Sequence, residues 1–289
     1  MVHQFFSLEY KDRGDLFEGL AIGKDEKYRK LQGTYPVINL SFARIKEKDF
    51  EKTKTKIYEI LRNEYIKFYY LRNSDALIEA DRETFDRILS KDMEETDATS
   101  SLYQLSDFLY RYYGKKVIIL LDEYDTPMQE AYVNGYWDEL VSFTRSLFNS
   151  TFKTNPYLER GLMTGITRVS KESIFSDLNN PEVITTTSEK YQSSFGFTER
   201  EVFEALDEYG YSNRKEEIKS WYDGFTFGSL TDIYNPWSIL NFLDKGKIST
   251  YWANTSSNRL IGKLIREGRR GYEGIVWAVA EGRTYPMLH

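Results

Sequence analysis

The chain has 289 residues, of which 40% are hydrophobic and 29% are charged, and its net charge is −6. This is a globular composition that suits one large or two modest domains, and it disfavours general nucleic-acid binding, which favours strongly basic domains. Because the chain has no cysteine and only two histidines, His3 and His289, disulfides, thiolate zinc sites and cysteine nucleophiles are excluded, and Ser-His-Asp triads and multi-histidine metal sites are disfavoured.

The first part of the chain alternates between predicted strands and predicted helices. Apolar runs typical of strands lie at residues 35–42 (YPVINLSF), 117–122 and 161–167 (GLMTGIT). Apolar residues at helical spacing predict helices over 51–71, 101–113 and 137–152, and a short helix within the polar stretch 73–100. Gly114 is predicted to end the helix before the second strand. This alternation implies a parallel sheet that helices cover on both faces.

The character of the sequence changes after residue 190. Thr198-Glu199-Arg200-Glu201 has the pattern of a helix capping box, with Phe197 and Val202 placed for a hydrophobic staple. Further helices fit residues 213–222 and 236–244. We therefore predict an α/β core over residues 1–190 and a smaller helical subdomain over residues 191–289.

The second predicted strand, within KKVIILLDEYDTP (115–127), ends in two adjacent acids, Asp122 and Glu123. This is the Walker B pattern, in which the first acid helps to hold Mg²⁺ and the second orients the attacking water. The alternative is a buried strand followed by a solvated acidic turn, since DEYDTP is also good turn sequence. Asp125 either supports such a site or caps the helix after Pro127, and we favour capping because aspartate is common in that role.

A phosphate site of this kind also needs the loop G-x-x-x-x-G-K-[ST], whose amides and lysine cradle the phosphates. Each Gly-Lys pair of the chain, at residues 23–24, 114–115, 246–247 and 262–263, is followed by a residue other than Ser or Thr. The acids of a nucleotide site are therefore present in the sequence, and the phosphate loop is not.

Several stretches together resemble the AAA-ATPase-like family of bacterial and archaeal proteins, which often carry a C-terminal PD-(D/E)XK nuclease-like domain. The matching stretches follow the family's order and cover nearly the whole chain. They are DLFEGLAI (15–22), YPVINLSF (35–42), GKKVIILLDEYDTPMQEAYVNGYW (114–137), LMTGITRVSKESIFSDLNN (162–180), FGFTEREV (195–202), WYDGFTFG (221–228), IYNPWSILNFL (233–243) and YWANTSSN (251–258).

The resemblance implies an α/β fold with a P-loop-NTPase-like parallel sheet and flanking helices, here truncated at its first strand and P-loop, plus a C-terminal helical subdomain. MVHQFF resembles the later part of the helix that follows the family's P-loop, so we expect an internal fragment or a shortened gene product of a larger protein. By position, Asp122 resembles the Mg²⁺-associated acid, Glu123 the catalytic carboxylate and Thr164 a sensor of the γ-phosphate or the water.

Arg168 follows that sensor position and either meets a phosphate, which suits its planar fork of donors, or forms a surface salt bridge with Glu172 or Asp177. The resemblance implies ATP and Mg²⁺ as ligands and an attached or separate nuclease-like domain as partner. In intact form the protein would hydrolyse ATP to drive an attached effector domain, whereas this chain is expected to be defective in turnover. The alternative is a non-catalytic interaction module with a vestigial nucleotide pocket that binds a partner protein or nuclease.

The remaining motifs have simpler interpretations that we favour. The aromatic residues of WYDGFTFG and IYNPWS are expected to close the helical subdomain onto the core, rather than to form a peptide- or base-binding surface. These residues are Trp221, Tyr222, Tyr234 and Trp237. The basic residues of 259–270 are expected on a solvated helix face. Asp122 and Glu123 are not expected to be nuclease ligands, because the next predicted strand, GLMTGIT, lacks the (D/E)-x-K triplet that a nuclease site needs. No apolar run approaches the ~20 residues of a membrane span, and we expect a cytoplasmic protein.

Overall fold

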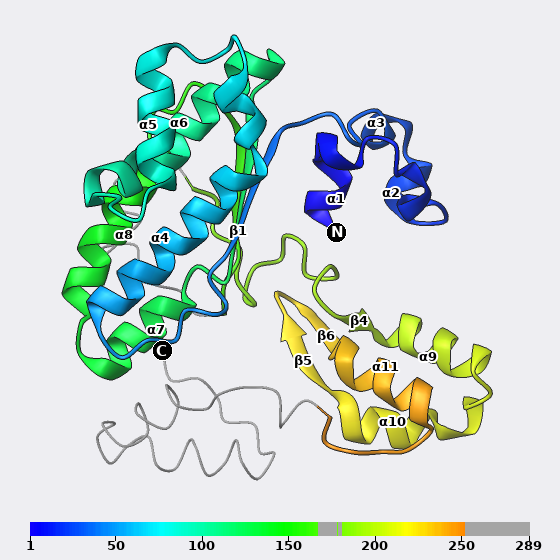
Figure 1. Ribbon diagram of the computed structural model, residues 1–289. Helices are drawn as coiled ribbons and strands as arrows, with labels where there is room; N and C mark the ends of the chain where they lie inside the picture. Colours follow the sequence, from blue (N-terminus) through cyan, green and yellow to red (C-terminus); the bar gives the residue numbers. More distant parts are fainter. Residues whose placement is uncertain (167–177, 179–180, 252–289) are drawn as a thin grey trace. The chain divides into compact units, whose positions relative to one another are not determined.

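The computed structural model describes residues 1–166, 178 and 181–251 (Figure 1). The chain divides into two compact units, Met1–Asn180 and Pro181–His289. This division lies N-terminal to the boundary near residue 190 that the change in sequence character predicts.

The first unit is built on a parallel sheet of three strands, β1 (Val37–Ser41), β2 (Val117–Asp122) and β3 (Leu158–Met163), in the order β1-β2-β3. Ser41 pairs with Asp122 at the carboxyl end of the sheet, and Leu121 pairs with Met163 one position earlier. The described part of this unit therefore has the parallel α/β architecture that the sequence predicts.

All the helices that connect these strands pack on one face of the sheet, as Figure 1 shows. Between β1 and β2 the chain forms α4 (Phe50–Lys67), η3 (Tyr69–Asn73), α5 (Glu79–Leu89) and α6 (Glu95–Tyr113). Between β2 and β3 it forms α7 (Thr126–Asn134) and α8 (Trp137–Phe152). Gly114 ends α6 in the left-handed conformation (φ 65°), which a glycine adopts without the steric cost of a Cβ atom.

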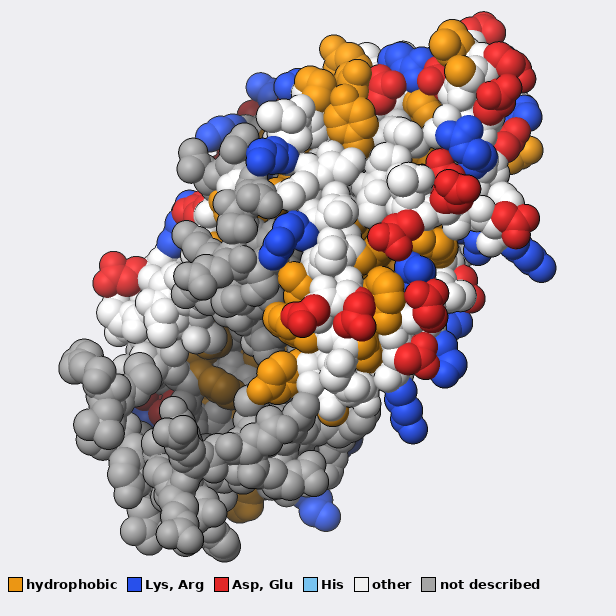
Figure 2. Space-filling view, turned by 90° about the vertical axis from the view of Figure 1, so that its left-hand side faces the viewer, with side chains coloured by type: hydrophobic (Ala, Val, Ile, Leu, Met, Phe, Trp, Pro, Cys, Tyr) orange, Lys and Arg blue, Asp and Glu red, His pale blue; other side chains and the backbone are white. Residues whose placement is uncertain are grey.

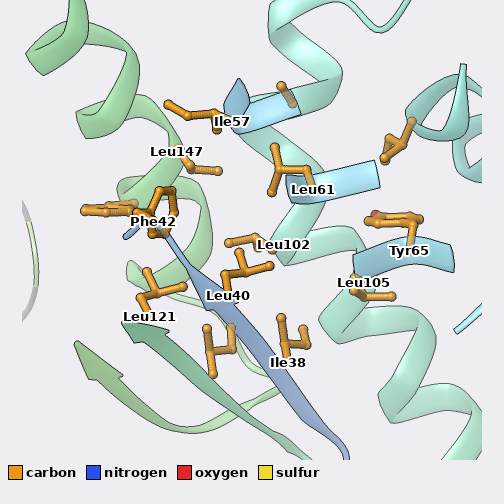
Figure 3. Packing of buried hydrophobic residues seen from close by; sticks show 14 of the residues in the cluster. Ile38, Leu40, Phe42, Ile57, Leu61, Tyr65, Leu102, Leu105, Leu121 and Leu147 are labelled. Atoms are coloured by element: carbon orange, nitrogen blue, oxygen red, sulfur yellow. The ribbon is translucent and has the colours of Figure 1, made fainter. Parts of the chain in front are cut away.

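The main hydrophobic core lies between this face and the helices (Figure 3). Alternate residues of β1 and β2 point toward the helices, because successive side chains of a strand face opposite sides of the sheet. The labelled residues in Figure 3 are buried and come from both layers: Ile38, Leu40, Phe42 and Leu121 from the sheet side, and Ile57, Leu61, Tyr65, Leu102, Leu105 and Leu147 from α4, α6 and α8.

The opposite face of the sheet carries a smaller cluster. Val37, Ile118 and Leu120 are buried there, with Phe6 and Tyr35 packed against them. Phe6 comes from the N-terminal segment, which consists of short helices: α1 (Val2–Phe6), η1 (Leu8–Tyr10), η2 (Gly14–Phe17), α2 (Ala21–Lys24) and α3 (Glu26–Arg29). The prediction that helices cover both faces thus holds for α4–α8 on one face, while the N-terminal segment contributes to the other.

The two edges of the parallel sheet differ. On β1, the buried carboxylate of Glu64 in α4 accepts a hydrogen bond from the backbone N–H of Asn39 (2.9 Å), and Lys67 Nζ donates both to Glu64 and to the carbonyl oxygen of Asn39 (3.4 Å). On β3, by contrast, the described residues provide pairing only with β2, and Leu162 is 46% exposed. Side chains therefore close the β1 edge, and the β3 edge is open within the described part of the chain.

The second unit combines helices with a small antiparallel sheet. Its helices are α9 (Glu199–Glu208), η5 (Ser212–Arg214), α10 (Lys215–Tyr222) and α11 (Pro236–Lys245). Its strands, in the order β4-β6-β5, are β4 (Phe197–Thr198), β5 (Asp223–Phe227) and β6 (Leu230–Tyr234). The predicted capping box is confirmed, since Thr198 and Glu201 each bond the other's backbone N–H. The sheet was not predicted, because aromatic and polar residues do not alternate cleanly along it.

On the face that Figure 2 shows, acidic and basic side chains are interspersed over the described part of the first unit. Within the ranges given above, none of the helices combines the length and the apolar character that crossing a bilayer requires.

Candidate functional site

The carboxyl ends of the three parallel strands bring together one polar side chain from each strand or its continuation. Thr164, directly after β3, donates a hydrogen bond from Oγ1 to Asp122 Oδ1 at 2.7 Å. Ser41, the last residue of β1, lies 3.5 Å from the other carboxylate oxygen, Oδ2. All three side chains are solvent-exposed. Asp122 and Thr164, which were both predicted as site residues, are thus in contact, and Ser41 is an additional member that the sequence analysis missed.

Glu123 is next to Asp122 in the chain but has different partners. Its backbone is in the left-handed region (φ 49°), which is uncommon for a residue with a side chain and is enriched at functional sites. Its carboxylate oxygen Oε2 accepts a hydrogen bond from Thr126 Oγ1 at 2.9 Å. In this structure the Glu123 carboxylate is therefore held at the start of α7, whereas Asp122 faces Thr164.

Asp125 corrects one prediction. It stands at the N-cap position of α7, yet its side chain makes no capping hydrogen bond, so the favoured capping role is wrong. Instead Asp125 is fully buried, and its Oδ2 accepts hydrogen bonds from the backbone N–H of Ile166 (3.1 Å) and from Gln129 Nε2 (3.0 Å). This carboxylate supports the segment that follows Thr164.

The other predicted contacts of this region fall on parts of the chain that are not described. Arg168 and its alternative partners Glu172 and Asp177 lie outside the described residues, and so does the basic stretch 259–270.

The Gly-Lys pairs occupy positions unlike those of a phosphate loop. Gly23-Lys24 closes the short helix α2, and Gly114 and Gly246 end α6 and α11 in the left-handed conformation. A phosphate loop instead precedes a helix and presents backbone N–H groups at its N-terminus. The Gly-Lys pairs within the described residues thus lie at or beyond the C-terminal ends of helices, which present carbonyl oxygens rather than amides.

The oxygen donors at the carboxyl edge are those that Mg²⁺ prefers, a carboxylate and hydroxyl groups. No group of three or more acidic or histidine side chains able to hold a metal ion occurs among the described residues. Mg²⁺ nevertheless usually binds through one or two carboxylates together with substrate phosphates and water. The donor set around Asp122 therefore fits a shared magnesium–phosphate site better than a cage made by the protein alone.

The aromatic motifs of the second unit split into two kinds. Tyr222 and Tyr234 are buried in the hydrophobic core of the second unit itself, whereas Trp221 and Trp237 are each 54% exposed. The tyrosines are therefore packed and the tryptophans are not, while the predicted contact with the α/β core stays a prediction. The tryptophans lie on α10 and α11, whose other faces are buried.

Charged residues from α9, α10 and the β5–β6 hairpin meet in the second unit. Lys219 Nζ contacts Glu199 and lies 3.3 Å from Asp232 Oδ1, and Tyr234 donates to Glu199 Oε2 at 3.2 Å. Desolvation by burial raises the pKa of Asp223, and its hydrogen bond with Asp232 acts in the same direction. The network joins α9, α10 and the β5–β6 hairpin.

A three-stranded parallel sheet with an acid at the carboxyl end of its central strand, covered by connecting helices, is an arrangement of the P-loop-like α/β class. The family model described as "Predicted AAA-ATPase" matches residues 1–175, and the chain belongs to this AAA-ATPase-like family.

A curated relative from Azotobacter chroococcum mcd 1, described as "Uncharacterized protein in vnfD 5'region", is 27% identical over 157 residues. The matched region covers 54% of this chain and 30% of that relative, so the match spans less than a third of the relative's length. No solved structure gives a significant match.

Proposed function

We propose that this chain is the AAA-ATPase-like module of a larger protein, and that it binds ATP with Mg²⁺ at the carboxyl ends of β1, β2 and β3. The observation that carries the proposal is the 2.7 Å hydrogen bond from Thr164 Oγ1 to Asp122 Oδ1, with Ser41 on the other carboxylate oxygen. In open α/β sheets, ligands bind beyond the carboxyl ends of the strands, where these side chains lie.

Asp122 would hold Mg²⁺, and the hydroxyls of Ser41 and Thr164 would orient its carboxylate. When bound, the ion bridges phosphate oxygens and neutralises their charge. Thr164 donates its single hydroxyl proton to Asp122 in this structure. In the nucleotide complex the same oxygen would still be able to accept a hydrogen bond from the water, whereas donation to the γ-phosphate would require the hydroxyl to leave Asp122. This assignment uses only oxygen donors, in agreement with the preference of Mg²⁺.

Glu123 would orient the attacking water, and Arg168 would donate to a phosphate. Glu123 is bonded to Thr126 in this structure, so it would have to exchange that hydroxyl for water. A hydrogen bond to a charged group contributes about 1.5–3 kcal/mol net, and a water molecule would replace this bond at the exposed Glu123 carboxylate, so the exchange has a modest free-energy cost.

The larger protein is supported by two features. The β3 edge is open within the described residues, and the matched region spans 30% of its curated relative. Because the sequence has no G-x-x-x-x-G-K-[ST] motif, we expect turnover by this chain alone to be defective. In the intact protein, ATP hydrolysis would drive a conformational change in an attached effector domain, for which the nuclease-like domain of the family is the candidate.

A second candidate function is a non-catalytic interaction module with a vestigial nucleotide pocket. It is favoured by the exposure of Trp221 and Trp237, since tryptophan is enriched among the residues that dominate protein interfaces. On this view the partner is a protein, such as a separately encoded nuclease.

Calorimetric titration of the 289-residue chain with Mg-ATP separates the two functions. The ATPase-like module predicts a saturable binding heat that Asp122→Ala removes. The matched control is Asp75→Ala, which changes an exposed aspartate next to Ala76, whose carbonyl accepts from Arg111 near the end of α6, where the chain enters β2. The absence of heat at millimolar nucleotide, or equal binding by Asp122→Ala, would contradict the nucleotide site and favour the interaction module.

A further inference from the structure

Asp125 differs from the other acids of its turn because it is fully buried. Aspartate is almost never fully buried unless its charge has bonding partners. Its Oδ2 accepts hydrogen bonds from the backbone N–H of Ile166, beyond β3, and from Gln129 Nε2, in α7. A single carboxylate therefore joins the first turn of α7 to the segment that leaves β3.

Gly165 brings the backbone of that segment unusually close to the carboxylate. A Cβ atom at residue 165 would lie 2.4 Å from Asp125 Oδ1 and 2.7 Å from its Cγ, well inside van der Waals contact. The segment can pass against Asp125 only because residue 165 has no side chain. The bond to Ile166 and the close approach of Gly165 both indicate that Asp125 holds the segment after β3 against α7. We call this connection the tether.

The tether acts on the residue whose hydroxyl meets Asp122. The backbone of Thr164 donates to the carbonyl of Leu121 (2.9 Å) and accepts from the N–H of Tyr124 (3.2 Å). These bonds hold Thr164 to β2, and the Asp125–Ile166 bond holds the chain two residues later. With both sides fixed, the Thr164 side chain is directed at Asp122, where it forms its 2.7 Å hydrogen bond.

We propose that Asp125 is a positioning residue: its buried carboxylate holds Gly165 and Ile166 so that the Thr164 hydroxyl stays on Asp122. Asp125 itself is buried behind the exposed site and does not contact a ligand there. Its effect on nucleotide affinity rests on the proposed function, whereas its effect on the segment after β3 does not. Sites that bind ligands depend on such support, because small displacements of the contacting groups weaken binding.

Amide hydrogen exchange, followed by NMR on the full chain, tests the tether without any ligand. Asp125→Ala is expected to raise exchange at Ile166 at least about tenfold and to raise it at Thr164, because a hydrogen bond to a charged group is lost. Asp125→Asn keeps an acceptor oxygen and is expected to restore most of the protection. Gln129→Ala, the matched control, removes only the other partner of Oδ2. Exchange at Ile119, in the middle of β2, distinguishes a local change from general destabilisation.

Unchanged exchange at Ile166 and Thr164 in Asp125→Ala would overturn the proposal, as would an equal rise at Ile119. Gly165→Ala gives an independent perturbation, since its new Cβ atom pushes the segment off an intact Asp125, and it is expected to reproduce the exchange pattern at Thr164.

Mg-ATP titration of the same variants adds the functional readout. If the unmodified chain binds, Asp125→Ala is expected to weaken the affinity of the folded protein about tenfold, with rescue by Asp125→Asn. Equal affinity would overturn the positioning role, because a residue that only stabilises the fold leaves the affinity of folded molecules unchanged. If the unmodified chain does not bind, the proposed function fails, and the exchange experiment alone decides the role of Asp125.

Discussion

Replacing Glu64 by alanine is expected to destabilise the first unit by about 1–3 kcal/mol. This is the cost of leaving a part-buried backbone N–H, here that of Asn39, without its hydrogen-bond acceptor. Glu64 is 2% exposed, and its Oε1 accepts the N–H of Asn39, which points out of the β1 edge. In Glu64→Ala no side chain of α4 replaces this acceptor, and Lys67 loses the anion that holds it beside Asn39. Urea denaturation, followed by far-UV circular dichroism, measures the change.

Glu64→Gln separates the hydrogen bond from the charge. The amide oxygen of glutamine can still accept from Asn39, so this variant is expected to lose much less stability than Glu64→Ala. Burial raises the pKa of the Glu64 carboxyl above its ordinary value, and the charge of Lys67 opposes this effect. Because the folded-state pKa exceeds the unfolded one, the stabilisation linked to this proton is complete below about pH 4 and is lost as the pH rises through the folded-state pKa.

Glutamine does not titrate, so the stability of Glu64→Gln relative to the unmodified protein is expected to improve between pH 4 and neutral pH. Equal losses in Glu64→Ala and Glu64→Gln, or a difference between Glu64→Gln and the unmodified protein that does not vary with pH, would refute this reasoning. Equal losses would mean that the contact with Asn39 does not protect the β1 edge, and a difference that does not vary with pH would mean that folding does not raise the pKa of Glu64.

Two further predictions concern the site and the second unit. Thr164→Val removes the hydroxyl that donates to Asp122 and is expected to weaken Mg-ATP binding about tenfold while leaving the urea midpoint nearly unchanged. Thr164→Ser is the control, because it keeps the hydroxyl. Tight binding by the valine variant would contradict the role of Thr164. Thr198→Ala removes the N-cap of α9 and is expected to cost about 1 kcal/mol, seen in the thermal unfolding of the second unit. A Thr198→Ala variant as stable as the unmodified chain would show that Glu201 alone satisfies this helix end.

The elements with strong periodicity could be predicted from the sequence. The predicted strand 117–122 matches β2, because its apolar residues form a continuous run. The predicted helix 137–152 matches α8, because its apolar residues recur at helical spacing along the whole segment. Asp122 and Thr164 could also be predicted to lie together, since the carboxyl ends of neighbouring parallel strands meet at one edge. The relevant signals are local patterns combined with a simple rule of sheet topology.

The contacts that depend on tertiary packing could not be predicted in this way. Asp125-Thr126-Pro127 has the sequence of a helix start, but the buried position of Asp125 brings its carboxylate to Ile166 instead, 41 residues away in sequence. Ser41 carried a weak signal, a polar residue at the end of an apolar strand. Glu64 carried a second weak signal, because it lies seven residues after Ile57, on the apolar stripe of α4. A charged residue at such a position needs a specific partner.

The hairpin of the second unit was missed for a different reason. Its strand pairing shifts register twice between β5 and β6, and Asp232 adopts a left-handed backbone (φ 57°), so the alternation of inward and outward residues is broken. Such irregular strands do not show a period of two, which is the signal that sequence analysis uses.

The central claim is that Asp122, Ser41 and Thr164 form the metal side of a nucleotide site. Paramagnetic broadening by Mn²⁺, titrated with ATP into the ¹⁵N-labelled chain, tests it most directly. The amide signals of these three residues are expected to broaden first, and Asp122→Asn is expected to abolish the effect. Broadening that centres on another cluster, such as Asp223 and Asp232 of the second unit, or that survives unchanged in Asp122→Asn, would contradict the assignment.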